Sequence, residues 1–302
     1  MDNPEFQKLS QAQLERLAFL DFRLYFLGSV GRPDICDRFG VVPMAASRDL
    51  AMYRELAPSN IRFDGKRKLY VPDDKFKPLF NHDPERVLSA LSRGFGEGIG
   101  RATSGFLTCE SPVRLNQPSL AVLSVITRAI HQRGGVRLTY HSLKSGTSKR
   151  EVVPFALVDS GQRWHFRCFD RKSKEFRDLV LTRVERPCLI EGGEIEHHEQ
   201  QDQDFQWSRI VELVLVPHPN HQYPEILARD YGLKEGRIVV PIRAAIAGYF
   251  LMQMGVDCTP DHSLDSSRYR LWLKDSEKVL YGVSSAVLAP GFPNVGDDIS
   301  KG

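Results

Sequence analysis

The N-terminal part of the chain carries apolar residues at helical spacing. Four leucines recur every three or four positions along a helix expected to end at Gly28: Leu17, Leu20, Leu24 and Leu27. A second helix is expected to begin near Pro33, where the missing N–H costs nothing, and to end at Gly40. A third is expected from about Pro43 to Leu56. The short turn at Gly40 gives these two helices the spacing of a helix-turn-helix.

Residues 60–71 predict a β-hairpin that follows the third helix. Two strand-like arms flank the dipeptide Asp64-Gly65, which favours a tight turn between antiparallel strands. A hairpin in this place is a wing, so we interpret residues 1–80 as a winged helix-turn-helix domain. Residues 81–117 predict a helical or flexible connector, and the glycine-rich stretch 93–100 is assigned to its flexible part.

Residues 118–190 predict a helix over 119–132 followed by a small sheet. In the strand 164–169, the residues Trp164, Phe166 and Cys168 share one parity, whereas His165 and Arg167 have the other. Successive strand residues point to opposite faces, so one face is expected in the core while the other offers cations. With two similar strands, this sheet is expected to gather one polar surface: Tyr140, Ser142, Arg150, His165, Arg167, Arg177 and Arg183.

The C-terminal part alternates between strand and helix patterns. Strands are expected at 210–216, 236–242 and 268–273, with helices at 224–231 and 244–254 between them. This order predicts a compact α/β module over 205–290, after a linker at 191–204 and before a loose tail at 291–302. The whole chain is thus expected to be an α+β multidomain protein.

Charge is distributed unevenly along the chain, whose formal net charge is +3. From Leu120 to Ile190 there are fourteen Lys and Arg against six Asp and Glu, a net of +8. After Ile190 there are ten basic against seventeen acidic residues, a net of −7. The cationic segment therefore needs a polyanionic ligand or an internal partner, and both remain open. Guanidinium groups suit a phosphate or another anion because they bind two of its oxygens.

The third helix and the wing carry candidate DNA contacts. Small residues near Ala45 would let this helix enter the major groove, where side chains reach base edges and the backbone. The wing cations would neutralise phosphates independently of sequence. Residues 1–80 have a net charge of only +2, which favours operator-specific binding by a dimer. The DNA-contacting candidates are Ser47, Arg48, Arg54, Arg62, Lys66, Arg67 and Lys68.

Short motifs in the middle of the chain resemble the WYL domain, a ligand-sensing module of bacterial transcription regulators: Tyr140-x-Ser142, Arg150-Glu151-x-x-Pro154, Arg163-Trp164-His165-x-Arg167 and Phe176-Arg177-x-x-x-Leu181-x-Arg183. Trp164-His165-Phe166 stands in place of the name-giving Trp-Tyr-Leu. This histidine and Arg167 are similar to the repressors found with BREX and CBASS anti-phage operons. The resemblance implies an Sm-like β-barrel over 118–190 and a C-terminal extension that forms dimers.

No catalytic constellation is apparent. The sequence offers no nucleophile elbow, no paired carboxylates in an apolar setting and no metal-ligand cluster, so we expect no enzyme, cofactor or metal site. The five cysteines are widely spaced, which predicts small buried side chains rather than disulfides. No apolar run is long enough to span a membrane, and the first residues are polar, so a cytoplasmic protein is expected.

These expectations combine into a dimeric, sequence-specific transcriptional repressor, with the resemblance pointing to an anti-phage defence operon. The operator is expected to be double-stranded DNA with an inverted repeat, because a helix-turn-helix dimer reads two half-sites. A nucleotide or single-stranded nucleic acid is the expected effector on the WYL domain. The alternatives are an RNA- or single-strand-binding module that does not act at an operator and, more remotely, a nuclease accessory subunit.

Overall fold

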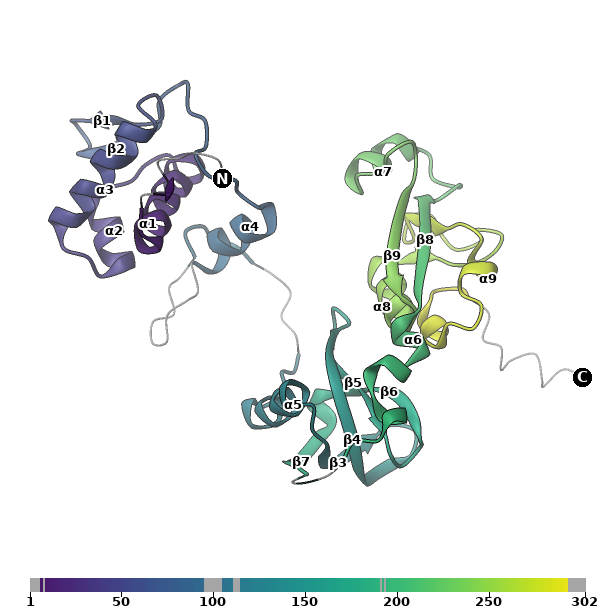
Figure 1. Ribbon diagram of the computed structural model, residues 1–302. Helices are drawn as coiled ribbons and strands as arrows, with labels where there is room; N and C mark the ends of the chain where they lie inside the picture. Colours follow the sequence, from purple (N-terminus) through teal and green to yellow (C-terminus); the bar gives the residue numbers. More distant parts are fainter. Residues whose placement is uncertain are drawn as a thin grey trace, which may run out of the picture. The chain divides into compact units, whose positions relative to one another are not determined.

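The computed structural model describes residues 6–292 apart from 8, 95–104, 111–114, 191 and 193. It divides the chain into two compact units, Met1–Ser111 and Pro112–Gly302. The first contains a helical core with a two-stranded hairpin, and the second contains two larger sheets (Figure 1). Within the described residues, no helix is both long and apolar enough to cross a bilayer.

Three helices and a π-helical turn form the core of the first unit: α1 (Gln11–Phe22), η2 (Arg23–Leu27), α2 (Arg32–Phe39) and α3 (Pro43–Leu56). α1 begins at Ser10, whose hydroxyl accepts the N–H of Gln13 at 3.3 Å. Gly28 and Gly40 end η2 and α2 with φ of 72° and 64°, a conformation that glycine adopts without strain. The predicted leucine stripe is confirmed, because three of its members are fully buried: Leu17, Leu20 and Leu24.

A hairpin and a fourth helix complete this unit: β1 (Arg62–Asp64), β2 (Leu69–Val71) and α4 (Pro84–Arg93). The hairpin is the predicted wing, and two backbone hydrogen bonds of 2.9 Å between Val30 and Tyr70 attach it to the helices. Asp83 begins α4 by accepting the N–H of Arg86 at 3.0 Å. Most of the glycine-rich stretch predicted to be flexible lies outside the described residues.

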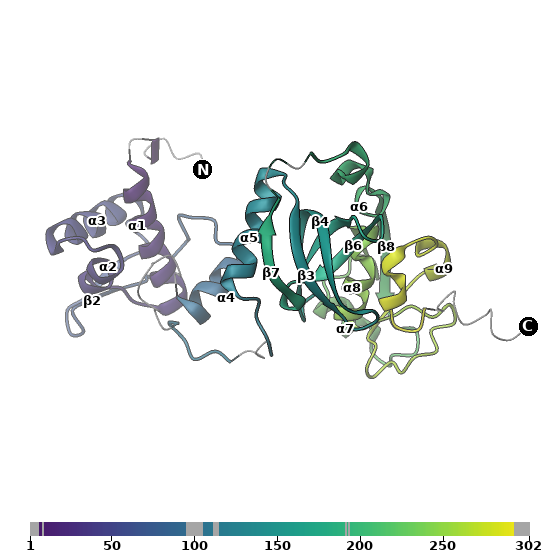
Figure 2. The same cartoon turned by 90° about the horizontal axis from the view of Figure 1, so that it is seen from below.

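In the second unit, a helix and five antiparallel strands form the middle of the chain: α5 (Leu120–Gln132), β3 (Val136–Ser142), β4 (Gly146–Asp159), β5 (Trp164–Asp170), β6 (Glu175–Val180) and β7 (Val184–Leu189). The strand order is β6-β5-β4-β3-β7, and α5 packs against β4 and β7 (Figures 1 and 2). Among the described residues β6 and β7 do not pair, so the sheet is open. The closed barrel implied by the family resemblance is therefore not observed.

The linker after this sheet is mostly exposed but is fixed at two buried points. The short turn η3 (Leu181–Arg183) precedes β7, and two more, η4 (His197–Glu199) and η5 (Gln201–Gln203), follow it in the linker. Two linker carboxylates are buried, Glu199 at 3% exposure and Asp204 at 1%. Since a buried carboxylate needs a partner, the linker must be held by cations of the sheet.

The C-terminal part has the predicted order of strands and helices: α6 (Phe205–Ser208), β8 (Ile210–Pro217), α7 (Pro224–Asp230), β9 (Ile238–Arg243), α8 (Ala244–Met254), β10 (Val256–Asp257), β11 (Leu271–Leu273), α9 (Ser276–Val279) and η6 (Ser284–Leu288). The sheet order is β10-β11-β8-β9. Helix α8 packs into the core of this module and touches η6 so closely that a Cβ at Gly248 would lie 1.7 Å from the Ser285 carbonyl oxygen.

The expectation of buried cysteines holds for Cys168 and Cys258, which are buried in the two sheet cores of the second unit. It is wrong for Cys109 and Cys188, which are exposed. Cys188 lies on β7, an edge strand of the middle sheet, and most residues of an edge strand are less covered by neighbours. All five thiols are free.

Candidate nucleic-acid interface and ligand surface

Helix α3 presents an exposed polar face. Arg48 and Arg54 are exposed, and Ser47 is half-buried with its hydroxyl donating to the Pro43 carbonyl at 3.0 Å. Asp49, the neighbour of Arg48, is 3% exposed and accepts the Arg16 guanidinium at 2.7 and 3.2 Å. Arg48 Nη2 lies 3.6 Å from Met44 Sδ and forms no ion pair with a described residue, so its charge is available on the surface.

The wing displays cations around a turn that one carboxylate organises. Asp64 accepts the N–H groups of Lys66 and Arg67 at 2.9 and 3.2 Å. Lys68 closes the turn in the left-handed region, with φ of 55°. All four predicted wing cations are exposed: Arg62, Lys66, Arg67 and Lys68. Among the described residues none of them forms an ion pair, so the wing can present its full charge to phosphates.

A buried aspartate, which the sequence reading missed, holds the helices and the segment after the wing together. Asp21 is 0% exposed and accepts the Tyr53 hydroxyl at 2.5 Å. It also accepts the N–H groups of Leu79 and Phe80 at 3.0 and 3.3 Å and lies 2.8 Å from His82 Nε2. Its signal in the sequence is a single acidic residue inside the apolar run of α1.

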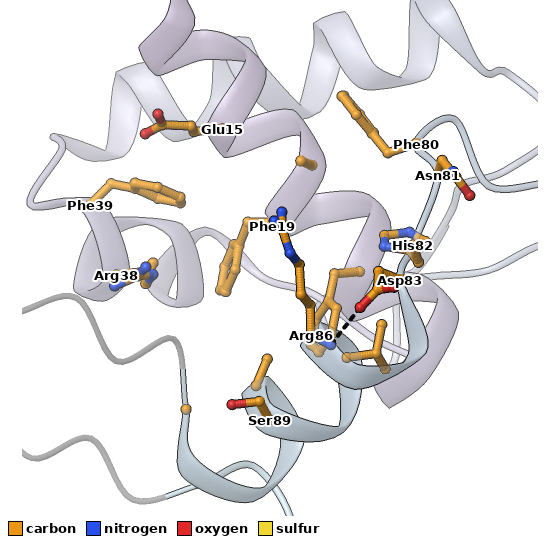
Figure 3. Close-up of a pocket in the computed structure, with 15 residues that line it drawn as sticks. Glu15, Phe19, Arg38, Phe39, Phe80, Asn81, His82, Asp83, Arg86 and Ser89 are labelled. Atoms are coloured by element: carbon orange, nitrogen blue, oxygen red, sulfur yellow. Dashed lines mark hydrogen bonds between the residues drawn. The ribbon is translucent and has the colours of Figure 1, made fainter. Parts of the chain in front are cut away.

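A cavity of about 610 Å³ lies in the same unit, lined from α1, α2, α4 and the segment before α4 (Figure 3). Four phenylalanines contribute to its walls, and two of them, Phe19 and Phe39, face it in the close-up. His82, Asp83 and Arg86 add polar groups at one side. None of the predicted DNA-contacting residues lines this cavity, so it is separate from the surface of α3 and the wing.

The strand registers of the middle sheet place the predicted ligand-binding residues on two opposite faces of that sheet. Opposed residues of a ladder share a face, and Arg177 lies opposite Cys168 whereas Asp178 lies opposite Arg167. By the same registers, four predicted residues lie on the side of the buried core: Tyr140, Ser142, Arg150 and Arg177. The expectation of one continuous polar surface is therefore wrong, because parity alone does not say which side of each strand faces the core.

The residues on the core side all bind other groups of the same chain. Tyr140 is 5% exposed, and its hydroxyl accepts the Val180 N–H at 3.1 Å. Arg150 lies 5.0 Å from the Tyr140 ring centroid and donates to Asp170 at 2.5 Å. The Ser142 hydroxyl accepts the N–H groups of the turn that follows at 3.2 Å each. Arg177 is exposed and pairs with Glu175.

The other face of β5 was expected to offer cations to solvent, and the structure shows it covered. Arg167 is 3% exposed, with Nε and Nη2 donating to Asp204 at 2.7 and 3.1 Å. Its Nη1 donates to Asp178 at 3.2 Å, and the hydroxyl of Tyr249 on α8 reaches the same carboxylate at 3.4 Å. Burial raises the pKa of Asp178, which the Arg167 charge opposes. The linker and α8 therefore supply the internal partner.

His165 shares the covered face. It is 7% exposed, its ring lies 5.1 Å from that of Tyr249, and its Nδ1 has no hydrogen-bond partner among the described residues. Burial lowers the pKa of His165, with the charges of Arg163 and Arg183 acting in the same direction. Arg183 itself is half-buried and forms no ion pair with a described residue. A role of these residues in ligand binding stays a prediction.

Three family models match successive parts of the chain. Residues 12–93 match the BrxR transcriptional regulator winged helix-turn-helix domain, and residues 121–189 match the WYL domain. Residues 210–279 match the BrxR transcriptional regulator C-terminal dimerization domain. The first match lies in the unit Met1–Ser111, and the other two lie in the unit Pro112–Gly302.

Whole-chain relatives agree with these models. The DNA-binding transcriptional repressor CapW of Pseudomonas aeruginosa is 33% identical over 257 residues, which cover 81% of this chain and 83% of that protein. CapW of Escherichia coli strain KTE188 is 30% identical over 281 residues, 88% of this chain and 90% of that protein. Both are named as repressors and neither as an enzyme. The solved structure of proteasome accessory factor B/C of Arthrobacter aurescens, at 19% identity and a TM-score of 0.26 over 93% of this chain and 48% of that one, adds nothing to the assignment. The chain belongs to the family of winged-helix WYL transcriptional regulators that includes the CapW repressors.

Proposed function

We propose that this protein is a dimeric repressor that binds the operator of an anti-phage defence operon and responds to a nucleotide or single-stranded nucleic acid at its WYL domain. The DNA part rests on one observation. The predicted cations of α3 and the wing are all exposed and form no ion pair with a described residue. The name of the CapW relatives supports the same role.

The two elements contribute differently to binding. Arg48 lies near the start of α3, where residues of a recognition helix reach base edges, and its contact would specify sequence. The wing cations would contact phosphates, which adds affinity without sequence preference and makes it depend on salt. Apolar Met44, 66% exposed one turn before Arg48, is placed to contact a thymine methyl group.

Gel shifts on operator and scrambled duplexes test this assignment. Arg48→Ala is expected to weaken operator binding by about 1–3 kcal/mol while leaving scrambled DNA nearly unaffected. Lys66→Ala is expected to weaken both duplexes about equally and to reduce the salt dependence. Arg137→Ala, which removes an exposed arginine of β3 paired with Glu151, is the matched control and should change neither. Unchanged operator affinity in Arg48→Ala would remove α3 from the role of recognition helix.

Dimerisation is proposed to use the C-terminal module and to make the operator an inverted repeat. The segment Ile238 to Met254 is the candidate for holding the two chains together, and within it the inner face of α8 packs in its own module. The strand β9 is an edge of its sheet and exposes Val239 at 44%, so the contact is assigned to β9. Val239→Glu should yield monomers in sedimentation experiments, and an intact dimer would contradict this assignment.

The effector class follows from the guanidinium groups of the WYL sheet, which bind two oxygens of a phosphate. An RNA- or single-strand-binding protein with no operator would share this chemistry. The unit 1–111 is compact by itself and carries the whole α3 and wing surface. Operator binding by this fragment alone separates the two functions, because a protein that acts only through the WYL sheet would lose all nucleic-acid binding.

A further inference from the structure

The side chain that covers Arg167 has the geometry of an anionic ligand. The two oxygens of Asp204 accept Nε and Nη2 of one guanidinium, at 2.7 and 3.1 Å. This is the bidentate arrangement in which an arginine holds a phosphate or a carboxylate. Arg167 is 3% exposed and Asp204 1%, so no external anion reaches this edge of the guanidinium while the pair is closed.

Asp204 also fixes the start of the C-terminal module. Its carboxylate accepts the N–H of Trp207 at 3.2 Å and its carbonyl accepts the N–H of Ser208 at 2.9 Å, so it caps α6. The carbonyl of Trp207 in turn accepts Arg243 Nη1 at 2.6 Å, at the end of β9. A displacement of Asp204 from Arg167 would therefore loosen α6 and its contact with the strand assigned to dimerisation.

The linker around Asp204 also forms a wall of a cavity of about 630 Å³ in the second unit. Residues 199–202 and 207–208 line it, on either side of Asp204, opposite β4 residues 153–155. Two arginines, Arg133 and Arg243, belong to the same lining, together with two carboxylates, Glu199 and Asp202, whereas Arg167 and Asp204 do not. An anion bound by these cations would lie against the segment that carries Asp204.

We infer that Asp204 acts as a built-in competitor that keeps Arg167 closed until a phosphate-bearing effector enters this cavity and replaces its carboxylate. The inference rests on the proposed function, because it assigns the regulation of the effector site on the WYL sheet. Replacement exchanges one pair of oxygens for another, so the arginine stays satisfied while α6 loses its cap. Effector binding at the sheet would thus change the linker and the start of α6.

Removing the competitor should tighten effector binding. When the competent state is populated only in a small fraction, the apparent Kd rises by the inverse of that fraction. If the pair is closed in about nine molecules of ten, the apparent Kd of the effector is about tenfold higher than its intrinsic Kd for the open state. Asp204→Asn keeps the size of the side chain and a good helix cap but removes the charge that competes for Arg167. We expect this variant to bind the probes about tenfold or more tightly than the unaltered protein.

The probes are adenosine monophosphate and the 5′-phosphorylated pentanucleotide of thymidine, titrated calorimetrically into the full chain. Tighter binding of the first alone identifies a mononucleotide as the source of the phosphate, and of the second alone a single strand. Glu196→Gln is the matched control, because it removes a charge from the same linker and the described ion pair of Glu196 is with the exposed His198. It should bind like the unaltered protein.

Equal affinity of Asp204→Asn and the unaltered protein overturns the competitor role while effector sensing stands. Absence of binding in both, with operator binding intact, overturns the sensing of phosphate ligands and the competitor with it. Hydrogen exchange on the unaltered protein gives a second measurement if the variant does not fold. A saturating probe should speed exchange of the Trp207 and Ser208 amides, and unchanged protection would overturn the proposal.

Discussion

Arg167→Ala tests the burial of the pair between the WYL sheet and the linker. The substitution leaves two carboxylates behind, with side-chain exposures of 2% for Asp204 and 10% for Asp178. Removing one partner of a buried pair costs about 3–5 kcal/mol, because the remaining charge is neither hydrated nor compensated. An exposed ion pair contributes only about 0–1 kcal/mol. We therefore expect the free energy of unfolding of the second unit to fall by about 3–5 kcal/mol.

Tryptophan fluorescence isolates this unit, because all three tryptophans of the chain lie in it: Trp164, Trp207 and Trp272. Urea unfolding followed at their emission gives the free energy from the midpoint and the slope. Arg137→Ala is the control, since the side chains of Arg137 and Glu151 are 59% and 38% exposed. It removes the same type of residue from the same sheet and should change the free energy by about 1 kcal/mol or less.

Equal losses in the two variants would refute the reasoning, because they would mean that burial adds nothing to the value of Arg167. A double variant sharpens the test. If the loss comes from uncompensated charge, Arg167→Ala combined with Asp204→Ala should be more stable than Arg167→Ala alone, since it removes one of the stranded carboxylates. The double-mutant cycle then gives the coupling of the pair. A double variant whose losses simply add would contradict a direct interaction.

Three further outcomes follow from single buried groups. Burial lowers the pKa of His165 below 6.5, so the unfolded state binds more protons than the folded state. The second unit should therefore lose stability as the pH falls below about 6.5. His165→Gln should flatten this pH dependence, measured by urea unfolding at several pH values. Gly248→Ala should cost about 3 kcal/mol or more in the same assay because its Cβ meets the Ser285 carbonyl, whereas Gly134→Ala, with nothing within 4 Å, should cost little. Asp21→Asn should lower the stability of the first unit by about 1–3 kcal/mol, measured by circular dichroism of the fragment 1–111, because it weakens a buried acceptor. An unchanged unfolding midpoint would show that the Asp21 cluster is not needed.

The winged helix-turn-helix was predictable because its signals are local. Leucine spacing, Gly28, Gly40 and the dipeptide Asp64-Gly65 each act over a few residues, and the helices and hairpin appear where these signals place them. The cluster around Asp21 was not predictable, because its partners come from segments 32 to 61 positions away. A single aspartate inside an apolar stripe signals that such partners exist without naming them.

The middle sheet shows where alternation stops being informative. Parity correctly separated Phe166 and Cys168 from His165 and Arg167 on β5. It could not relate strands to one another, so Arg177 was grouped with Arg167 although the register puts them on opposite faces. It also could not reveal that the polar face would be covered, because the covering side chains, Asp204 and Tyr249, lie 37 and 82 positions after Arg167.

The charge counts along the chain left two explanations open, an external polyanion or an internal partner, and the structure shows the internal partner. Arg167 and Arg171 carry charge from the cationic segment and bind Asp204 and Glu199 from the acidic one. An internal carboxylate at such a position neither adds large net stability nor excludes a ligand, because desolvation offsets most of the attraction between buried charges. Under the proposed competition at Arg167, a phosphate-bearing effector would have to overcome only a small net free energy. A switch at Arg167 requires this balance. If the pair had a large net stability it would never open, and if the arginine were solvated there would be no closed pair for a ligand to open.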